Sequence, residues 1–129
     1  MNSLNLNYLR GLYDYLLGKS DEELEDFDIN LPANREILFE EMKRSFLKFG
    51  PISKNNIIDG INLIIANYSN DNLWRNAIPH DLSLNRVIDR REYLEAILFV
   101  LTNSTPSPVA ADDFFLVDEI GPQGLNYSE

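Results

Sequence analysis

The chain has 129 residues, of which 44% are hydrophobic and 11% aromatic, so it can bury a core of its own and is not composed like a disordered chain. Its formal net charge is −10 and its pI is about 4.4, a balance that opposes binding to nucleic acid or anionic membranes and favours a basic partner. The absence of cysteine excludes a disulfide framework and thiolate catalysis.

The first predicted helix ends at Gly18, a typical C-cap residue. The apolar residues before it have the i, i+3, i+4, i+7 spacing of one helix face. They are Leu9, Leu12, Tyr13, Leu16 and Leu17. A second, short helix is predicted to start at Asp21, because Ser20 is followed three residues later by Glu23, as in a capping box. Pro32 is expected to end this segment.

The stretch from 21 to 28, DEELEDFD, contains six acidic residues and no basic one. Acids near a helix N-terminus are favoured by the helix dipole, but six are more than this effect requires. One interpretation is a solvated acidic face. The other is a surface that binds Lys and Arg of a partner and steers its association. The candidate contact residues are Asp21, Glu22, Glu25, Asp26 and Asp28.

Two long helices are predicted next. Asn34 is the expected N-cap of the first, and Gly50 with Pro51 would stop it. Its buried stripe is expected to contain Leu38, Phe39, Met42, Phe46 and Phe49. The second is expected to start at Ser53. Its inward face would contain Ile57, Ile58, Ile61, Ile64, Ile65 and Tyr68.

The stretch from 67 to 81 is rich in turn residues and is predicted to be a loop. It holds the only tryptophan, Trp74, which either closes the core under the loop or anchors a partner. The longest helix is predicted from Leu84 to Thr102. Its buried stripe would contain Val87, Leu94, Ile97, Leu98 and Leu101.

The last part of the chain is predicted to break at residues 103–108, NSTPSP, and to end in a loose tail from about residue 121. Between them, VAADDFFLVDEIG is expected to form a short helix or an edge strand. Its acids surround an aromatic centre, as a binding surface for a basic partner would, unless Phe114 and Leu116 pack on the core. These second candidate contact residues are Asp112, Asp113, Asp118 and Glu119.

The predicted fold is therefore all-α: one domain, residues 1–129, built as a compact bundle of about five helices. We expect a monomer without a signal peptide or a membrane span, located in the cytoplasm. We expect no enzyme and no cofactor, because HExxH, GxSxG, EF-hand and Gly-rich phosphate motifs are absent. The single histidine, His80, has no second ligand or nucleophile at a useful spacing, so we predict no catalytic or metal residues.

A small, cysteine-free, strongly acidic helical chain with the segments SDEELEDFD (20–28) and ADDFFLVDEIG (111–121) resembles the bacterial immunity proteins that protect cells from contact-dependent growth inhibition toxins. The resemblance implies that the protein binds one cognate toxin, often a basic nuclease, and covers its active site or substrate-binding surface. An acidic segment would stand in for the phosphate that such a site holds. The alternative is a small acidic adaptor or regulatory protein, of a nucleic-acid-mimicking kind, that binds a basic protein.

Overall fold

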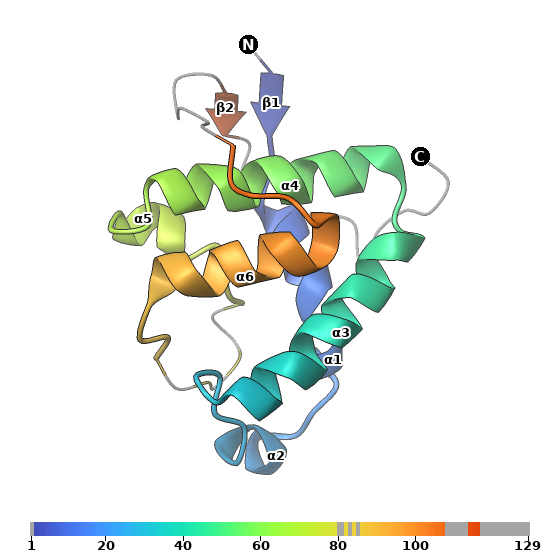
Figure 1. The fold of residues 1–129 in the computed structure, drawn as a ribbon, viewed down its shortest axis with the longest axis vertical. Helices are drawn as coiled ribbons and strands as arrows, with labels where there is room; N and C mark the ends of the chain where they lie inside the picture. The colour runs from blue at the N-terminus through green and yellow to red at the C-terminus, as the bar shows by residue number, and fades with distance from the viewer. Residues whose placement is uncertain (1, 80–81, 83, 85, 108–113, 117–129) are drawn as a thin grey trace.

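Three helices form the frame of the molecule: α3 (Pro32–Lys48), α4 (Pro51–Ala66) and α6 (Arg90–Thr102). Helix α6 packs against both α3 and α4, and α3 runs obliquely away from the other two towards one end of the molecule (Figure 1). The computed structural model describes residues 2–79, 82, 84, 86–107 and 114–116. Within them the predicted all-α class is confirmed.

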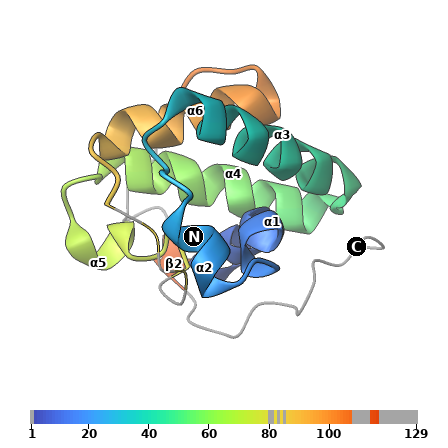
Figure 2. The ribbon, with the colours of Figure 1, turned by 90° about the horizontal axis from the view of Figure 1, so that it is seen from below.

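The N-terminal helical segment lies across the frame. A 3-10 helix, η1 (Leu6–Tyr13), continues into the short α1 (Asp14–Leu17), so the predicted first helix is in the right place but is mostly of the tighter 3-10 type. It packs against α3 and α4, on the side of α4 away from α6 (Figure 2). Gly60 on α4 permits this close approach, since a Cβ there would lie 3.2 Å from the Leu6 side chain.

The buried faces follow the predicted stripes on α3 and α6: every residue named for them above is buried, including Val87, which precedes α6. On α4, Ile57, Ile61, Ile64 and Ile65 are buried, whereas Ile58 is half-buried. The prediction was wrong for Tyr68, which is exposed. Because α4 ends at Ala66, Tyr68 no longer follows the helical repeat.

Two helix starts differ from prediction because proline begins these helices rather than ending the preceding segment. Pro32 is the first residue of α3, with Leu31 as its N-cap, and Pro51 is the first residue of α4, with Gly50 as its N-cap. The first helical position needs no N–H donor and suits the fixed φ of proline. The expected N-cap Asn34 instead lies in the first turn of α3, where its side-chain amide donates to the Asp28 carbonyl.

The start of α6 was also predicted too early. The helix begins at Arg90, because the Asp89 side chain caps it by accepting a hydrogen bond from the Glu92 N–H at 3.0 Å. With 13 residues, α6 is shorter than α3, which has 17. The predicted loop before it contains one short helix, α5 (Asp71–Trp74).

Trp74 is half-buried and packs against the core, so it closes the core rather than standing out as an exposed anchor. Its ring packs edge-on against buried Tyr93 with centroids 6.5 Å apart, and the Arg90 guanidinium lies 4.9 Å from its centroid. The Tyr93 hydroxyl in turn lies 2.9 Å from that of Tyr13. This aromatic cluster joins α5 and α6 to the N-terminal segment.

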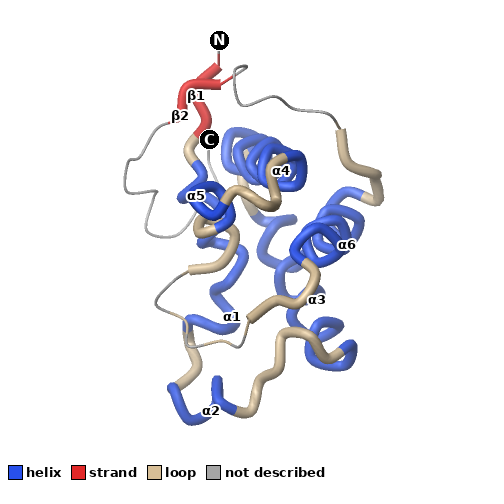
Figure 3. Tube along the Cα trace, turned by 90° about the vertical axis from the view of Figure 1, so that its left-hand side faces the viewer, coloured by secondary structure: helices blue, strands red, loops and turns tan. Residues whose placement is uncertain are grey.

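A two-stranded parallel sheet lies at one end of the molecule. Its strands are β1 (Asn2–Leu4) and β2 (Phe114–Leu116), with Asn2 opposite Phe114 and Leu4 opposite Leu116. The strand alternative for the second acidic segment is therefore the correct one, whereas β1 was not predicted. The short helix α2 (Asp21–Glu25) lies at the opposite end of the molecule from this sheet (Figures 1 and 3). The predicted loose tail from about residue 121 falls outside the described residues.

Candidate functional site

Helix α2 forms where the sequence predicts it, because its first turn is capped by its own residues. Ser20 and Glu23 make a full capping box: the Ser20 hydroxyl accepts the Glu23 N–H at 3.3 Å, and the Glu23 carboxylate accepts the Ser20 N–H at 3.2 Å. The hydrogen bond from the Ser20 backbone lowers the pKa of Glu23 below its ordinary value. Only Leu24 of this helix is buried, so α2 displays its acids to solvent.

The acids displayed by α2 are not neutralised. Asp21, Glu22, Glu25 and Asp26 are all exposed, and none forms an ion pair with another described residue. Glu23 alone in this helix has a cation beside it, Lys19 at 3.8 Å. Four other acids of the described residues do pair with an arginine: Glu41 with Arg44, Asp71 with Arg90, Glu92 with Arg35 and Glu95 with Arg91.

Asp28, the fifth candidate residue, has a different environment. It is half-buried and its carboxylate accepts the N–H of Asn30 at 2.9 Å, so it shapes the turn that follows α2. The second group of candidates, Asp112, Asp113, Asp118 and Glu119, lies outside the described residues. The described part of their segment, β2, lies at the far end of the molecule from α2 (Figure 3).

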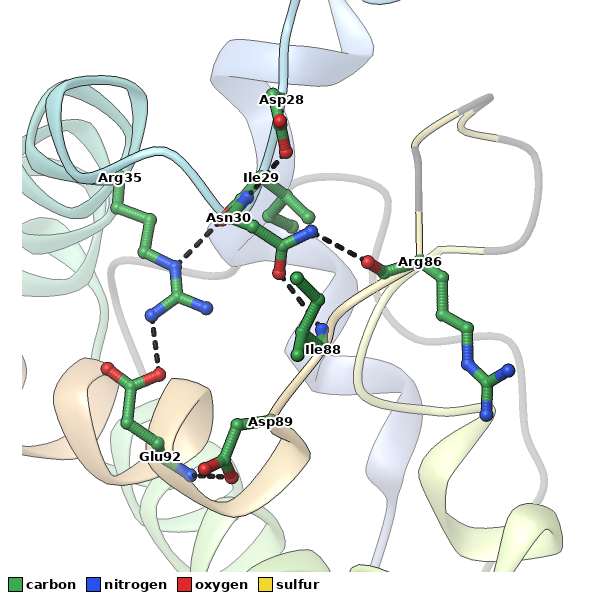
Figure 4. Close-up of polar contacts among 8 residues, drawn as sticks. All are labelled: Asp28, Ile29, Asn30, Arg35, Arg86, Ile88, Asp89 and Glu92. Carbon is green, nitrogen blue, oxygen red and sulfur yellow. Dashed lines mark hydrogen bonds and ion pairs between the residues drawn. The ribbon is translucent and has the colours of Figure 1, made fainter.

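The turn after α2 is fixed to the segment that precedes α6 by one side chain, that of Asn30. Its amide nitrogen donates to the Arg86 carbonyl at 2.8 Å, and its amide oxygen accepts the Ile88 N–H at 2.9 Å (Figure 4). The side chain thus satisfies a donor and an acceptor of an otherwise irregular backbone. We call this pair of hydrogen bonds the Asn30 clamp.

Arg35 ties the same turn to α6 from the other side (Figure 4). Its Nε donates to the Ile29 carbonyl at 2.7 Å, and its terminal nitrogen lies 2.6 Å from the Glu92 carboxylate. Its guanidinium also lies over the buried Tyr93 ring, 5.2 Å from the centroid. We call α2 with its capping residue and the turn after it, residues 20–31, together with the segment 86–89 bound to that turn, the acidic end. The Asn30 clamp and Arg35 hold it in place although α2 itself is short.

Sequence reasoning missed Asn30, Arg35 and Ile88. The Asn30 hydrogen bonds join residues 56 and 58 positions apart, and the Arg35–Glu92 pair spans 57 positions, so no local pattern reports them. One usable signal existed: Asp89 followed three residues later by Glu92 is a helix-start pattern and would have located the beginning of α6.

A second charged region lies where α3 meets α4. Between Met42 and Ile58 the chain has no acid, and we call residues 43–54 the basic corner after its Lys43, Arg44, Lys48 and Lys54. Lys43 and Lys48 are exposed and form no ion pair with other described residues. Two apolar side chains, Leu47 and Ile52, are exposed beside them.

Comparisons with known proteins add no assignment to this site: no family model, no curated protein and no solved structure matches the chain. In the described part of the chain, no three His, Cys, Asp or Glu side chains come together as a metal site. None of the helices described there is long and apolar enough to cross a membrane. His80 lies outside the described residues.

Proposed function

We propose that this protein is an immunity protein that binds a cognate basic toxin, most simply a nuclease, and neutralises it with the acidic end that carries α2. The observation that carries the proposal is the uncompensated charge of Asp21, Glu22, Glu25 and Asp26 on a helix whose base is held by the Asn30 clamp and Arg35. Such a protein would act in the cytoplasm.

The electrostatics favour a partner that holds phosphate. Like charges in one short helix repel each other, and binding to Lys and Arg would relieve that repulsion. A nuclease site is lined with such cations because it must hold a polyanion. Carboxylates at the spacing of one helix turn would occupy it in place of phosphates, and attraction between the two surfaces would raise the association rate.

The test uses the purified protein encoded by the adjoining open reading frame, since an immunity gene normally lies beside its toxin gene. We expect tight binding and loss of nuclease activity on a nucleic acid substrate. We also expect the association rate to fall between about 0.01 M and 0.15 M salt, because the electrostatic screening length shortens from roughly 30 Å to 8 Å. A bound protein that keeps full nuclease activity would favour the adaptor alternative instead.

A matched pair of charge reversals locates the contact. Glu22→Lys/Asp26→Lys changes two exposed acids four residues apart in and just after α2, whereas Glu36→Lys/Glu40→Lys changes two exposed acids with the same spacing on α3. Both variants have the same net charge. We expect the first to slow association about 10-fold or more and the second to have a much smaller effect. Equal effects would mean that overall charge, not α2, attracts the partner.

A further inference from the structure

Ile88 has the most exposed large apolar side chain in the described part of the chain, at 84%. It lies between buried Val87 and Asp89, the N-cap of α6. A single exposed apolar side chain is common on protein surfaces and needs no explanation by itself. Ile88 differs in how firmly its backbone is held.

The backbone of Ile88 is fixed on both sides. Its own N–H is bound by the Asn30 clamp, which also holds the Arg86 carbonyl two residues earlier (Figure 4). The next residue, Asp89, is the N-cap of α6. Because the backbone that carries this largely exposed side chain is already held in one conformation, inserting the side chain into a partner's pocket would cost little backbone entropy.

The charge around Ile88 indicates what kind of partner fits. Exposed Asp89 follows Ile88 in the chain, and exposed Leu31 follows Asn30, directly after the clamp. Asp28 lies on the other side of Asn30, where it accepts the Asn30 N–H (Figure 4). Three arginines close to Ile88 in the chain or in Figure 4 are ion-paired, namely Arg35 with Glu92, Arg90 with Asp71 and Arg91 with Glu95. The Arg86 side chain points away from Ile88 (Figure 4). An exposed apolar residue next to Asp89, on a segment that the clamp joins to the turn after acidic α2, is complementary to an apolar pocket bordered by Lys or Arg. That is the arrangement of an interface hot spot with a charged rim.

We infer that Ile88 is the apolar anchor with which this protein docks on its basic partner, while the acids of α2 form the charged rim that steers the approach. The inference rests on the proposed function and deepens it: the partner surface must offer an apolar pocket with cations around it. The two parts affect different rate constants. The acids of α2 raise the association rate by electrostatic steering, whereas Ile88 in a filled pocket lowers the dissociation rate.

The experiment compares Ile88→Ala with Ile52→Ala in binding to the same purified product of the adjoining open reading frame. Ile52 is the matched control, because it is also an exposed isoleucine, at 55%, but lies in the basic corner. We expect Ile88→Ala to raise Kd about 10-fold or more through faster dissociation, with the salt dependence of association unchanged. Ile52→Ala should leave Kd within about 2-fold.

The outcomes separate the two proposals. Equal Kd values for Ile88→Ala and Ile52→Ala, with binding still weakened by Glu22→Lys/Asp26→Lys, would overturn the anchor and leave the immunity function standing. Failure of the unmodified protein to bind or inhibit would overturn the proposed function and the anchor together. Thermal unfolding of Ile88→Ala should match that of the unmodified protein, because so exposed a side chain contributes little packing.

Discussion

The acidic end and the basic corner are built from similar parts but carry charges of opposite sign. Each exposes an isoleucine, Ile88 in one and Ile52 in the other, and each carries charges without ion-pair partners among the described residues. They lie at the two ends of α3, whose 17 residues span about 25 Å. The corner is the natural control for tests of the acidic end. It also has an exposed isoleucine and charged side chains without ion pairs to other described residues, but its charges are positive.

The two regions also differ in how they are held. The corner is a direct turn between two long helices, with Phe46 and Phe49 buried beneath it. The acidic end buries Leu24 and Ile29, but its turn and helix start are held by polar contacts: a capping box, the Asn30 clamp and Arg35. Loss of these polar contacts should therefore weaken the acidic end. Two substitutions at these contacts test this, and a third, on α4 beyond the basic corner, is expected to have a smaller effect of opposite sign.

The largest effect is expected from Arg35→Met. This change removes the hydrogen bond to Ile29 and the ion pair with Glu92 while keeping an apolar stem, and hydrogen bonds of charged groups are worth about 1.5–3 kcal/mol. We expect the free energy of unfolding in urea to fall by about 2–3 kcal/mol. Lys48→Met in the basic corner removes the same charge from an exposed side chain and should change it by less than about 0.5 kcal/mol. An equal fall in the free energy of unfolding for both variants would show that the lost positive charge, and not the contacts of Arg35, causes the destabilisation.

A smaller, local effect is expected from Ser20→Ala. Losing an N-cap serine costs about 1 kcal/mol of helix stability. Because α2 has only five residues and one buried side chain, the loss should appear as faster hydrogen exchange of its amides rather than of the core. Ser69→Ala, at an exposed serine outside any helix, is the control. Unchanged exchange in α2 would mean that the capping box does not hold this helix.

The smallest effect, and one of opposite sign, is expected at Asp59, the first acid on α4 after the basic corner. Burial raises the pKa of Asp59 above its ordinary value of 3.8, so the folded protein holds this proton more tightly than the unfolded chain does. Ionisation at neutral pH therefore costs stability, and the cost disappears as the pH falls below the ordinary value.

Asp59→Asn should accordingly unfold at a slightly higher temperature than the unmodified protein at pH 7 and at the same temperature near the acid limit of folding. Glu36→Gln removes one negative charge from an exposed position on α3 and serves as the control for net charge. A stabilisation that persists unchanged at low pH would rule out desolvation of Asp59 as its cause.

Local patterns predicted local structure well and distant contacts not at all. The capping box of Ser20 and Glu23 and the stripe from Leu38 to Phe46 depend on residues three or four apart, so they could be read directly. Proline was ambiguous, because it suits both the end of one segment and the first turn of the next.

The base of the candidate site could not be predicted, for a physical reason. The hydrogen-bond partners of the Asn30 amide could not be predicted, because an asparagine in a turn has many possible local partners. Its actual partners are backbone groups more than 50 residues away in the chain. The exposure of Ile88 was equally hidden, since an apolar run before a helix resembles the first turn of that helix.

The sheet of β1 and β2 at the end opposite α2 bears on how the molecule can be tethered (Figure 3). Because Asn2 is the first residue of β1, a surface linker joined to the start of the chain would leave from the sheet end. The molecule would then stand on that end, with the acids of α2 directed into the solution. An N-terminally immobilised bait would thus present the acids of α2 to the solution, whereas random coupling through lysines would use Lys19 beside α2 as well as the basic corner and orient the molecules unevenly.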